Sequence, residues 1–116
     1  MSKQYDLEER TFLFAQRVRA FTKAIPRSIE NQEDARQLVR ASGSVGANYI
    51  EANEALSKRD FVMRIKISRK ESKESRFFLR LVDPGDDPAL AEEQTRLIQE
   101  AQELTNIFGA IVRKSE

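Results

Sequence analysis

The sequence predicts an all-α protein built as an antiparallel, up-down-up-down four-helix bundle. The 116 residues include only four Gly and three Pro, and 34% of them are charged, which is typical of helices with solvated outer faces. Apolar residues recur every three or four positions in four separate stretches, as they do along one face of a helix. The connections between these stretches are short, which places neighbouring helices antiparallel.

Local signals mark where the predicted helices begin and end. Pro26 ends the first helix, because proline lacks a backbone N–H and restricts the residue before it. Asn31 is the predicted N-cap of the second helix, and Ser57 with Asp60 has the capping-box spacing before the third. Asp87 and the proline after it suit the start of the fourth. The helices are predicted within one domain of residues 1–116, at about 7–25, 32–56, 58–82 and 88–113.

The second predicted helix is crowded with small residues in its first half. Gly43 and Gly46 together cost it about 1–2 kcal/mol of helix propensity, and close approach of a neighbouring helix is the expected compensation. A Gly-rich phosphate loop is the rival interpretation, but no Lys-Ser or Lys-Thr pair follows the glycines and no strand precedes them. The predicted buried stripe is Leu38, Ser42, Val45, Tyr49, Ala52 and Leu56.

The third predicted helix carries two apolar sets on roughly opposite sides, at about 100° per residue. One helix cannot send both sets into the core of a single chain. Two interpretations remain open: a helix buried more deeply than average, or a subunit interface on the second face. The first set is Phe61, Ile65, Ser68, Ser72, Ser75, Leu79 and Val82, and the second, the candidate oligomer interface, is Met63, Ile67, Phe77, Phe78 and Leu81.

Charge is unevenly distributed along the chain, although the net charge is only +1. Residues 57–80 contain nine Lys or Arg and three acidic residues, whereas residues 81–116 contain three and eight. Such a basic stretch can bind RNA or DNA phosphates with salt-sensitive, sequence-independent affinity, although no exposed aromatic is expected among the bases for stacking. The alternative is that the bases pair with Glu71, Glu74 and acids of the fourth helix, in the same or the next subunit. The candidate basic face is Lys58, Arg59, Arg64, Lys66, Arg69, Lys73, Arg76 and Arg80.

Neither Cys nor His occurs in the sequence. This excludes disulfides, thiolate nucleophiles, Cys/His zinc sites, Ser-His-Asp triads and the Glu-x-x-His ligands of di-iron bundles. The carboxylate pairs Glu51/Glu54 and Glu71/Glu74 have the spacing of a cation site or an acid–base pair, but such pairs are more often solvated or salt-bridged. We therefore predict no enzyme, cofactor or metal ligand. The absence of an apolar run of about 20 residues and of an apolar N-terminal block predicts a cytoplasmic protein without membrane contact.

Three segments resemble a known family: S-V-G-A-N-Y-I-E-A (44–52), S-K-R-D-F (57–61) and I-K-I-S-R-K-E-S-K-E-S-R-F-F-L-R-L (65–81). They are similar to the bacterial four-helix bundles first noticed as open reading frames in intervening sequences of 23S ribosomal RNA genes. Phe78 stands where this subgroup often has Trp. The characteristic polar positions that match are Asn48, Glu51, Asp60, Lys70, Glu71 and Glu74.

The resemblance implies a homopentamer and no catalytic residues. A relative, the accessory protein of diversity-generating retroelements, is a basic pentameric barrel that associates with a reverse transcriptase and nucleic acid. The expected function is therefore a noncatalytic homo-oligomeric assembly or adaptor protein that binds nucleic acid or a ribonucleoprotein through the basic face. The alternative is a purely structural oligomer, or an adaptor for a protein partner.

Overall fold

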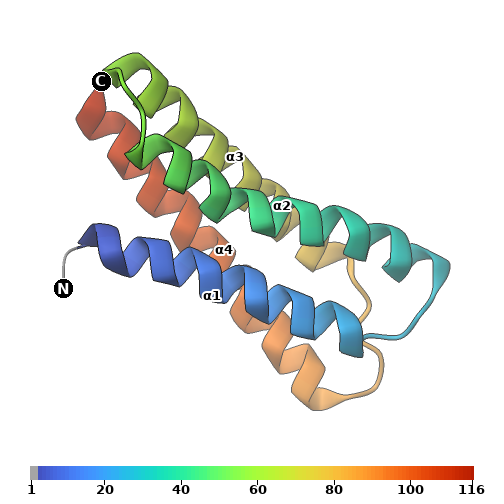
Figure 1. Cartoon of the computed structure of the whole chain (residues 1–116). Helices are drawn as coiled ribbons and strands as arrows, with labels where there is room; N and C mark the ends of the chain where they lie inside the picture. The colour runs from blue at the N-terminus through green and yellow to red at the C-terminus, as the bar shows by residue number, and fades with distance from the viewer. Residues whose placement is uncertain (1–2) are drawn as a thin grey trace.

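Four helices form an antiparallel bundle in the computed structural model, which describes residues 3–116, with side chains from Leu7 onward (Figure 1). They are α1 (Lys3–Ala24), α2 (Ile29–Asn53), α3 (Lys58–Leu81) and α4 (Pro88–Ser115). Each helix lies beside the next in the chain, and α4 returns beside α1. The most extensive contacts join α2 to α3 and α3 to α4, whereas α1 packs less extensively on α2 and α4. The all-α bundle prediction is confirmed.

The start of α2 differs from the prediction that Asn31 caps it. Ser28 is the N-cap, and its Oγ accepts a hydrogen bond from the Asn31 backbone N–H at 3.0 Å. The Asn31 side chain is instead buried, donating through Nδ2 to the carbonyls of Pro26 at 2.9 Å and Asp83 at 2.8 Å. Its Oδ1 accepts from the Asp83 N–H at 3.0 Å. Asn31 therefore joins the α1–α2 turn to the α3–α4 turn. The residues around Asn31 in the sequence do not indicate this long-range contact.

The end of α2 also differs from the prediction, because the helix stops at Asn53 and Leu56 is not part of its buried stripe. Leu56 is 100% exposed. The predicted N-cap of α3 explains the early stop. Ser57 has the extended backbone of a cap, and its Oγ accepts from the Asp60 N–H at 3.1 Å. The chain must leave α2 before Ser57 to adopt this conformation, so Leu56 falls in the turn.

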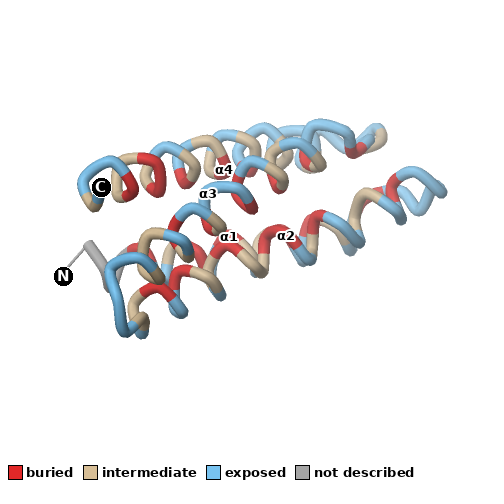
Figure 2. The backbone as a smooth tube through the Cα atoms, turned by 90° about the horizontal axis from the view of Figure 1, so that it is seen from above, coloured by how far each residue is buried: buried red, intermediate tan, exposed pale blue. Residues whose placement is uncertain are grey.

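The predicted start of α4 is confirmed by its cap. Asp87 Oδ1 accepts from the Ala89 N–H at 2.9 Å, and Pro88 is the first residue of the helix. Buried residues recur along the sides of the four helices that face one another (Figure 2). Within residues 3–116, none of the helices has the length and apolarity needed to cross a bilayer.

Small residues let α2 approach both of its neighbours. On the α3 side, Ser68 is fully buried and its Oγ donates to the Val45 carbonyl of α2 at 2.9 Å. On the α1 side, a Cβ built on Gly46 would lie 2.8 Å from Thr11 Oγ1. The close approach expected from the glycines is therefore present, and the helix that approaches Gly46 is α1.

Candidate nucleic-acid interface

The outer surface of α3 carries most of the predicted basic residues. The buried side of this helix packs between α2 and α4, so its remaining side points outward. Arg64 is an exception, because it is half-buried and its Nη1 donates to Asn48 Oδ1 of α2 at 3.2 Å. Arg76 is half-buried as well, and its Nε has no hydrogen-bond partner within the described part of the chain. The exposed bases of α3 are Lys58, Arg59, Lys66, Arg69, Lys70, Lys73 and Arg80.

A basic row runs along the edge of α3 that borders α4. Its members, which we call the basic row, recur at intervals of three and four residues: Lys66, Arg69, Lys73, Arg76 and Arg80. Lys66 Nζ lies 3.2 Å from Glu116 Oε2. Arg69 lies against α4, since a Cβ on Gly109 would be 3.7 Å from its Cδ. These two contacts place the row beside α4, and all its members except the half-buried Arg76 are exposed.

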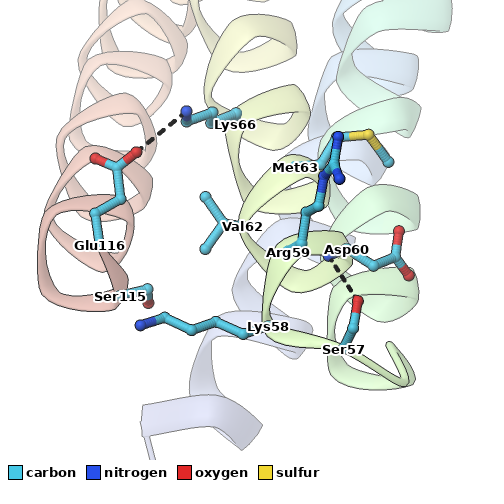
Figure 3. A pocket seen from close by; sticks show the side chains of 9 residues that line it. All are labelled: Ser57, Lys58, Arg59, Asp60, Val62, Met63, Lys66, Ser115 and Glu116. Carbon is cyan, nitrogen blue, oxygen red and sulfur yellow. Dashed lines mark hydrogen bonds and ion pairs between the residues drawn. The ribbon is translucent and has the colours of Figure 1, made fainter.

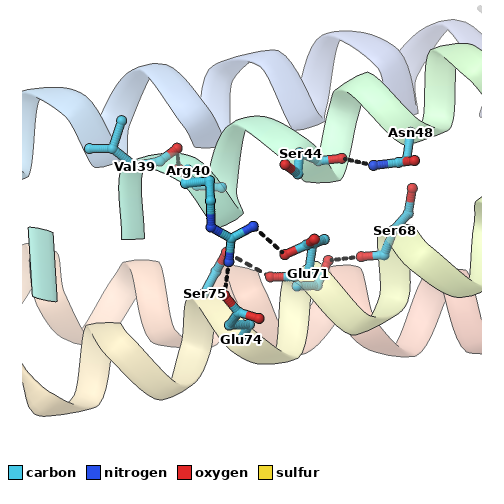
Figure 4. Close-up of polar contacts among 10 residues, drawn as sticks. Val39, Arg40, Ser44, Asn48, Ser68, Glu71, Glu74 and Ser75 are labelled. Carbon is cyan, nitrogen blue, oxygen red and sulfur yellow. Dashed lines mark hydrogen bonds and ion pairs between the residues drawn. The ribbon is translucent and has the colours of Figure 1, made fainter. Parts of the chain in front are cut away.

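The two acids inside the basic stretch of α3 do not neutralise the row. Glu71 and Glu74 both pair with Arg40 of α2 (Figure 4). Arg40 Nη1 lies 3.5 Å from Glu71 Oε1, and its Nη2 contacts Glu74 Oε2. These acids point from α3 toward α2, so the alternative that they pair with α3 bases of the same subunit is wrong for both.

Three of the four acids of α4 are likewise directed elsewhere, toward α1, and the fourth, Glu92, pairs with Arg96 of α4 itself. Arg10 forms a bidentate pair with Glu100, through Nε at 2.7 Å and Nη2 at 2.8 Å, and Nη2 also lies 2.8 Å from Glu103 Oε1. Arg17 forms a second bidentate pair with Glu93 at 3.1 and 3.0 Å. The hydrogen bonds that Arg10 donates to Glu100 raise the pKa of Arg10, and those that Arg17 donates to Glu93 raise the pKa of Arg17. Hydrogen bonds from Gln99 and Arg10 lower the pKa of Glu103.

Most bases of α3 consequently have no acidic partner within 4.0 Å among the described residues of their own chain. Among the residues that the structure describes, Lys66 is the one member of the basic row with a carboxylate oxygen within 4.0 Å. Lys58 and Arg59, at the start of α3, have no carboxylate oxygen within 4.0 Å among the same described residues. The alternative of pairing within one subunit therefore holds for Lys66. Among the described residues it is wrong for the other basic-row members and for Lys58 and Arg59. Pairing with a further subunit stays a prediction.

The beginning of α3 and the end of α4 enclose an open depression of about 880 Å³ (Figure 3). Lys58 extends toward Ser115, and Arg59 stands beside Met63. Lys58, Arg59 and Lys66 line this depression, so basic side chains continue from the basic row to the end of the bundle. Its lining is Ser57, Lys58, Arg59, Asp60, Val62, Met63, Lys66, Ser115 and Glu116.

The second apolar set of α3 divides into two groups. Met63, Phe77 and Leu81 are 48%, 54% and 53% exposed, so deep burial of the helix does not account for them. Ile67 is half-buried, and Phe78 packs partly against the core. In a single chain, Met63, Phe77 and Leu81 are therefore accessible to a binding partner.

Phe77 corrects the prediction that no exposed aromatic stands among the bases. It lies four residues after Lys73 and three before Arg80, and residues at these spacings are neighbours on a helix surface. Its ring meets the ring of Phe78 edge to face, with centroids 5.2 Å apart and an interplanar angle of 83°. The i−4 and i+3 spacing was visible in the sequence, but its exposure depends on α3 having neighbours on only part of its circumference.

The family-like polar residues mainly join α2 to α3 or sit at the surface. Asn48 accepts from Arg64 and donates through Nδ2 to the Ser44 carbonyl at 2.9 Å (Figure 4). Periodicity of α3 alone could not identify Arg40, which holds both acids of that helix. Asp60 lies in the first turn of α3, Glu71 and Glu74 pair with Arg40, and Glu51 and Lys70 are exposed.

The carboxylate pairs do not form a larger acidic cluster. Glu51 and Glu54 are both exposed, and Arg40 holds the other pair. No group of three or more Asp or Glu residues positioned to hold a metal ion occurs among the described residues. What the arrangement offers chemically is a positive surface with an aromatic ring in it.

Comparison with known proteins identifies a family and a related fold. A model of the family described as 23S rRNA-intervening sequence protein matches residues 3–110. The structure is similar to that of a protein from Bacteroides thetaiotaomicron VPI-5482, described as having unknown function and belonging to the S23 ribosomal protein family. The TM-score is 0.80, with 23% identity, over 97% of this chain and 99% of that one. This likeness shows the fold alone. None of the curated proteins compared with the chain matches it.

Proposed function

Since this chain belongs to the 23S rRNA-intervening sequence protein family, we propose that it is a noncatalytic, homo-oligomeric adaptor that binds nucleic acid through α3. The observation that supports this most directly is the set of α3 bases without an acidic partner within 4.0 Å, among the residues described. Unpaired positive charge on one face attracts polyanions and concentrates them at that face. We keep a cytoplasmic location as part of the proposal.

The length of the basic row suits contact with several phosphates. From Lys66 to Arg80 the row extends about 21 Å along the helix, at 1.5 Å per residue. Binding by such a row releases counterions, so affinity falls steeply as salt is raised, and it depends little on base sequence. Repetition of α3 around a closed oligomer would multiply this positive surface.

The second candidate is a purely structural oligomer, or an adaptor for a protein partner, that binds no nucleic acid. Phe77 and Leu81 favour it, because they are exposed large apolar side chains four residues apart and thus neighbours on α3, and grouped exposed apolar side chains are typical of interaction surfaces. Met63 is a further exposed apolar residue nearer the start of the same helix. Sedimentation tests the oligomeric part of both candidates. A single species near 13.4 kDa would contradict the proposed homo-oligomer.

A charge-reversal titration separates the two candidates. Lys73→Glu with Arg80→Glu changes two exposed bases that have no acidic partner among the described residues. We expect binding of RNA and of single-stranded and duplex DNA to weaken at least about tenfold at low salt, and the salt slope to fall by about one unit per lost phosphate contact.

The matched control is Lys23→Glu with Arg27→Glu, which makes the same change in net charge on exposed residues near the α1–α2 turn. We expect this control to bind nearly as well as the unchanged protein. Equal weakening by both double variants would show that only total charge matters. Unchanged binding by the α3 variant would exclude the basic row as the site, and absence of any binding at either of two salt concentrations would favour the second candidate.

A further inference from the structure

Phe77 is the feature of the basic surface that phosphate binding does not explain. Its side chain is 54% exposed although it is large and apolar, and exposing it to water is unfavourable. Its helix neighbours are Lys73 and Glu74 on the preceding turn and Arg80 and Leu81 on the following turn. Glu74 is held by Arg40 of α2, so the cations Lys73 and Arg80 are the neighbours without a charged partner among the described residues. An exposed ring between two cations differs from an ordinary surface aromatic, because one ligand can engage all three groups.

The ring of Phe77 is supported from one side. Phe78 packs partly against the core and meets Phe77 edge to face at 5.2 Å. This arrangement is a favourable one for aromatic pairs. A supported ring loses less conformational freedom when a ligand stacks on it, which favours binding.

We infer that the α3 surface takes unpaired, single-stranded nucleic acid, with one base stacked on Phe77 and the flanking phosphates near Lys73 and Arg80. This inference rests on the proposed function and specifies its ligand. Lys73 and Arg80 lie about 6 Å and 4.5 Å from Phe77 along the helix axis, on opposite sides of it. A base can reach an aromatic ring when its strand is unpaired, whereas duplex bases are stacked on one another.

A second copy of the chain is the other ligand that could cover Phe77. That contact would remove Lys73 and Arg80 from water together with the ring, and since neither has an acidic partner within 4.0 Å among the described residues, the second copy would have to supply a carboxylate to each of them. Burying unpaired charges is unfavourable. A nucleic acid strand supplies phosphates to the same two cations, so it satisfies the ring and the charges at once.

The test uses three substitutions, a 12-nucleotide single-stranded RNA and an RNA duplex of the same sequence. The chain contains no Trp, so Phe77→Trp gives a single indole whose emission reports on this position. We expect the single strand to quench that emission and the duplex to leave it nearly unchanged. Phe77→Ala should weaken single-strand binding at least about fivefold and duplex binding less than about twofold, because stacking acts on the single strand alone.

Phe12→Ala is the matched control, since Phe12 is 58% exposed on α1 beside Glu8 and Glu9 rather than among bases. It should bind both probes like the unchanged protein. Circular dichroism of each variant establishes that the helices are intact, and Phe77→Trp keeps an aromatic ring should the alanine variant fail to fold.

Three results would overturn the inference. The first is that Phe77→Ala weakens the binding of both probes equally, and the second is that it weakens the binding of neither. The third is that the indole of Phe77→Trp emits like a buried ring and is not quenched by the single strand, while Phe77→Ala lowers the oligomer mass. The last result would identify a second copy as the ligand. The Lys73 and Arg80 reversal still decides the proposed function in each case, because it tests phosphate contact without reference to stacking.

Discussion

Replacing Gly46 with Ala tests the close approach of α1 and α2. The added methyl carbon would lie 2.8 Å from Thr11 Oγ1 and 3.2 Å from Thr11 Cβ, where ordinary van der Waals contact begins near 3.4 Å. Thr11 is 1% exposed, and its Oγ1 donates to the Glu8 carbonyl at 2.9 Å, so it cannot rotate away freely. Something in the α1–α2 contact must therefore shift.

Two opposing effects set the size of the change. Ala in place of Gly inside a helix favours the folded state by about 1 kcal/mol. Overpacking a close contact costs about 1–3 kcal/mol. The free energy of unfolding of Gly46→Ala should therefore fall by between about 0 and 2 kcal/mol, which alone is too wide a range for a sharp test.

Gly43→Ala supplies the control that sharpens it. A Cβ at Gly43 would lie 3.3 Å from Arg19 Nη2, the end of a flexible, exposed side chain. This substitution keeps the propensity gain of about 1 kcal/mol with little packing cost. Gly43→Ala should thus be more stable than Gly46→Ala by about 1–3 kcal/mol.

Urea unfolding measures this difference in the free energy of unfolding. Equal slopes of that free energy against urea concentration show that the two variants unfold from comparable states. One fixed protein concentration keeps the contribution of association the same for both. A Gly46→Ala protein as stable as Gly43→Ala would refute the close-approach argument. Gly46→Leu extends the series. It should lower the melting temperature further, and an unchanged melting temperature would contradict the same argument.

Two further predictions concern polar contacts. Asn31→Ala removes three hydrogen bonds, one to Pro26 in the α1–α2 turn and two to Asp83 in the α3–α4 turn, and leaves buried groups unpaired. The free energy of unfolding should therefore fall by about 2–3 kcal/mol; an unchanged urea midpoint would show that the two turns are stable independently. The pKa of Glu103 is lowered below its ordinary 4.5, so its stabilising contribution is complete above pH 4.5 and is lost as the pH falls through the lowered value. Glu103→Gln should flatten the pH dependence of the urea midpoint in that acidic window, and an identical pH profile would exclude this linkage.

The helices could be predicted from the sequence because their signals are local. A residue three or four positions away is on the same side of a helix in any fold, so the buried stripe of α3 through Ile65, Ser68 and Leu79 follows from spacing. The caps at Ser57 and Asp87 are local too, and both are present. The predictions for Asn31 and Leu56 were wrong because contacts outside their own helix decide their positions. Asn31 bonds to Asp83 in the α3–α4 turn, and the cap of α3 at Ser57 leaves Leu56 in the turn before it.

The exposure of Phe77 needed information that periodicity lacks. Spacing shows that α3 has two apolar sides, but not how many helices surround it. In the bundle α3 packs on α2 and α4, which leaves one side without a neighbour. The same apolar residue is therefore buried or exposed according to the arrangement of the bundle.

The charge of α3 depends on long-range pairing in the same way. A basic third helix followed by an acidic fourth helix favours the hypothesis that the two neutralise each other. The bundle is closed by α1, however, and Arg10 and Arg17 reach Glu100 and Glu93, which lie 90 and 76 positions away in sequence. An α4 carboxylate already held by two hydrogen bonds from an arginine has little left to offer a lysine on α3. The ion pairs between α1 and α4 thus occupy acids that could otherwise neutralise the basic row. A chain of net charge +1 can therefore still have a positive surface on α3.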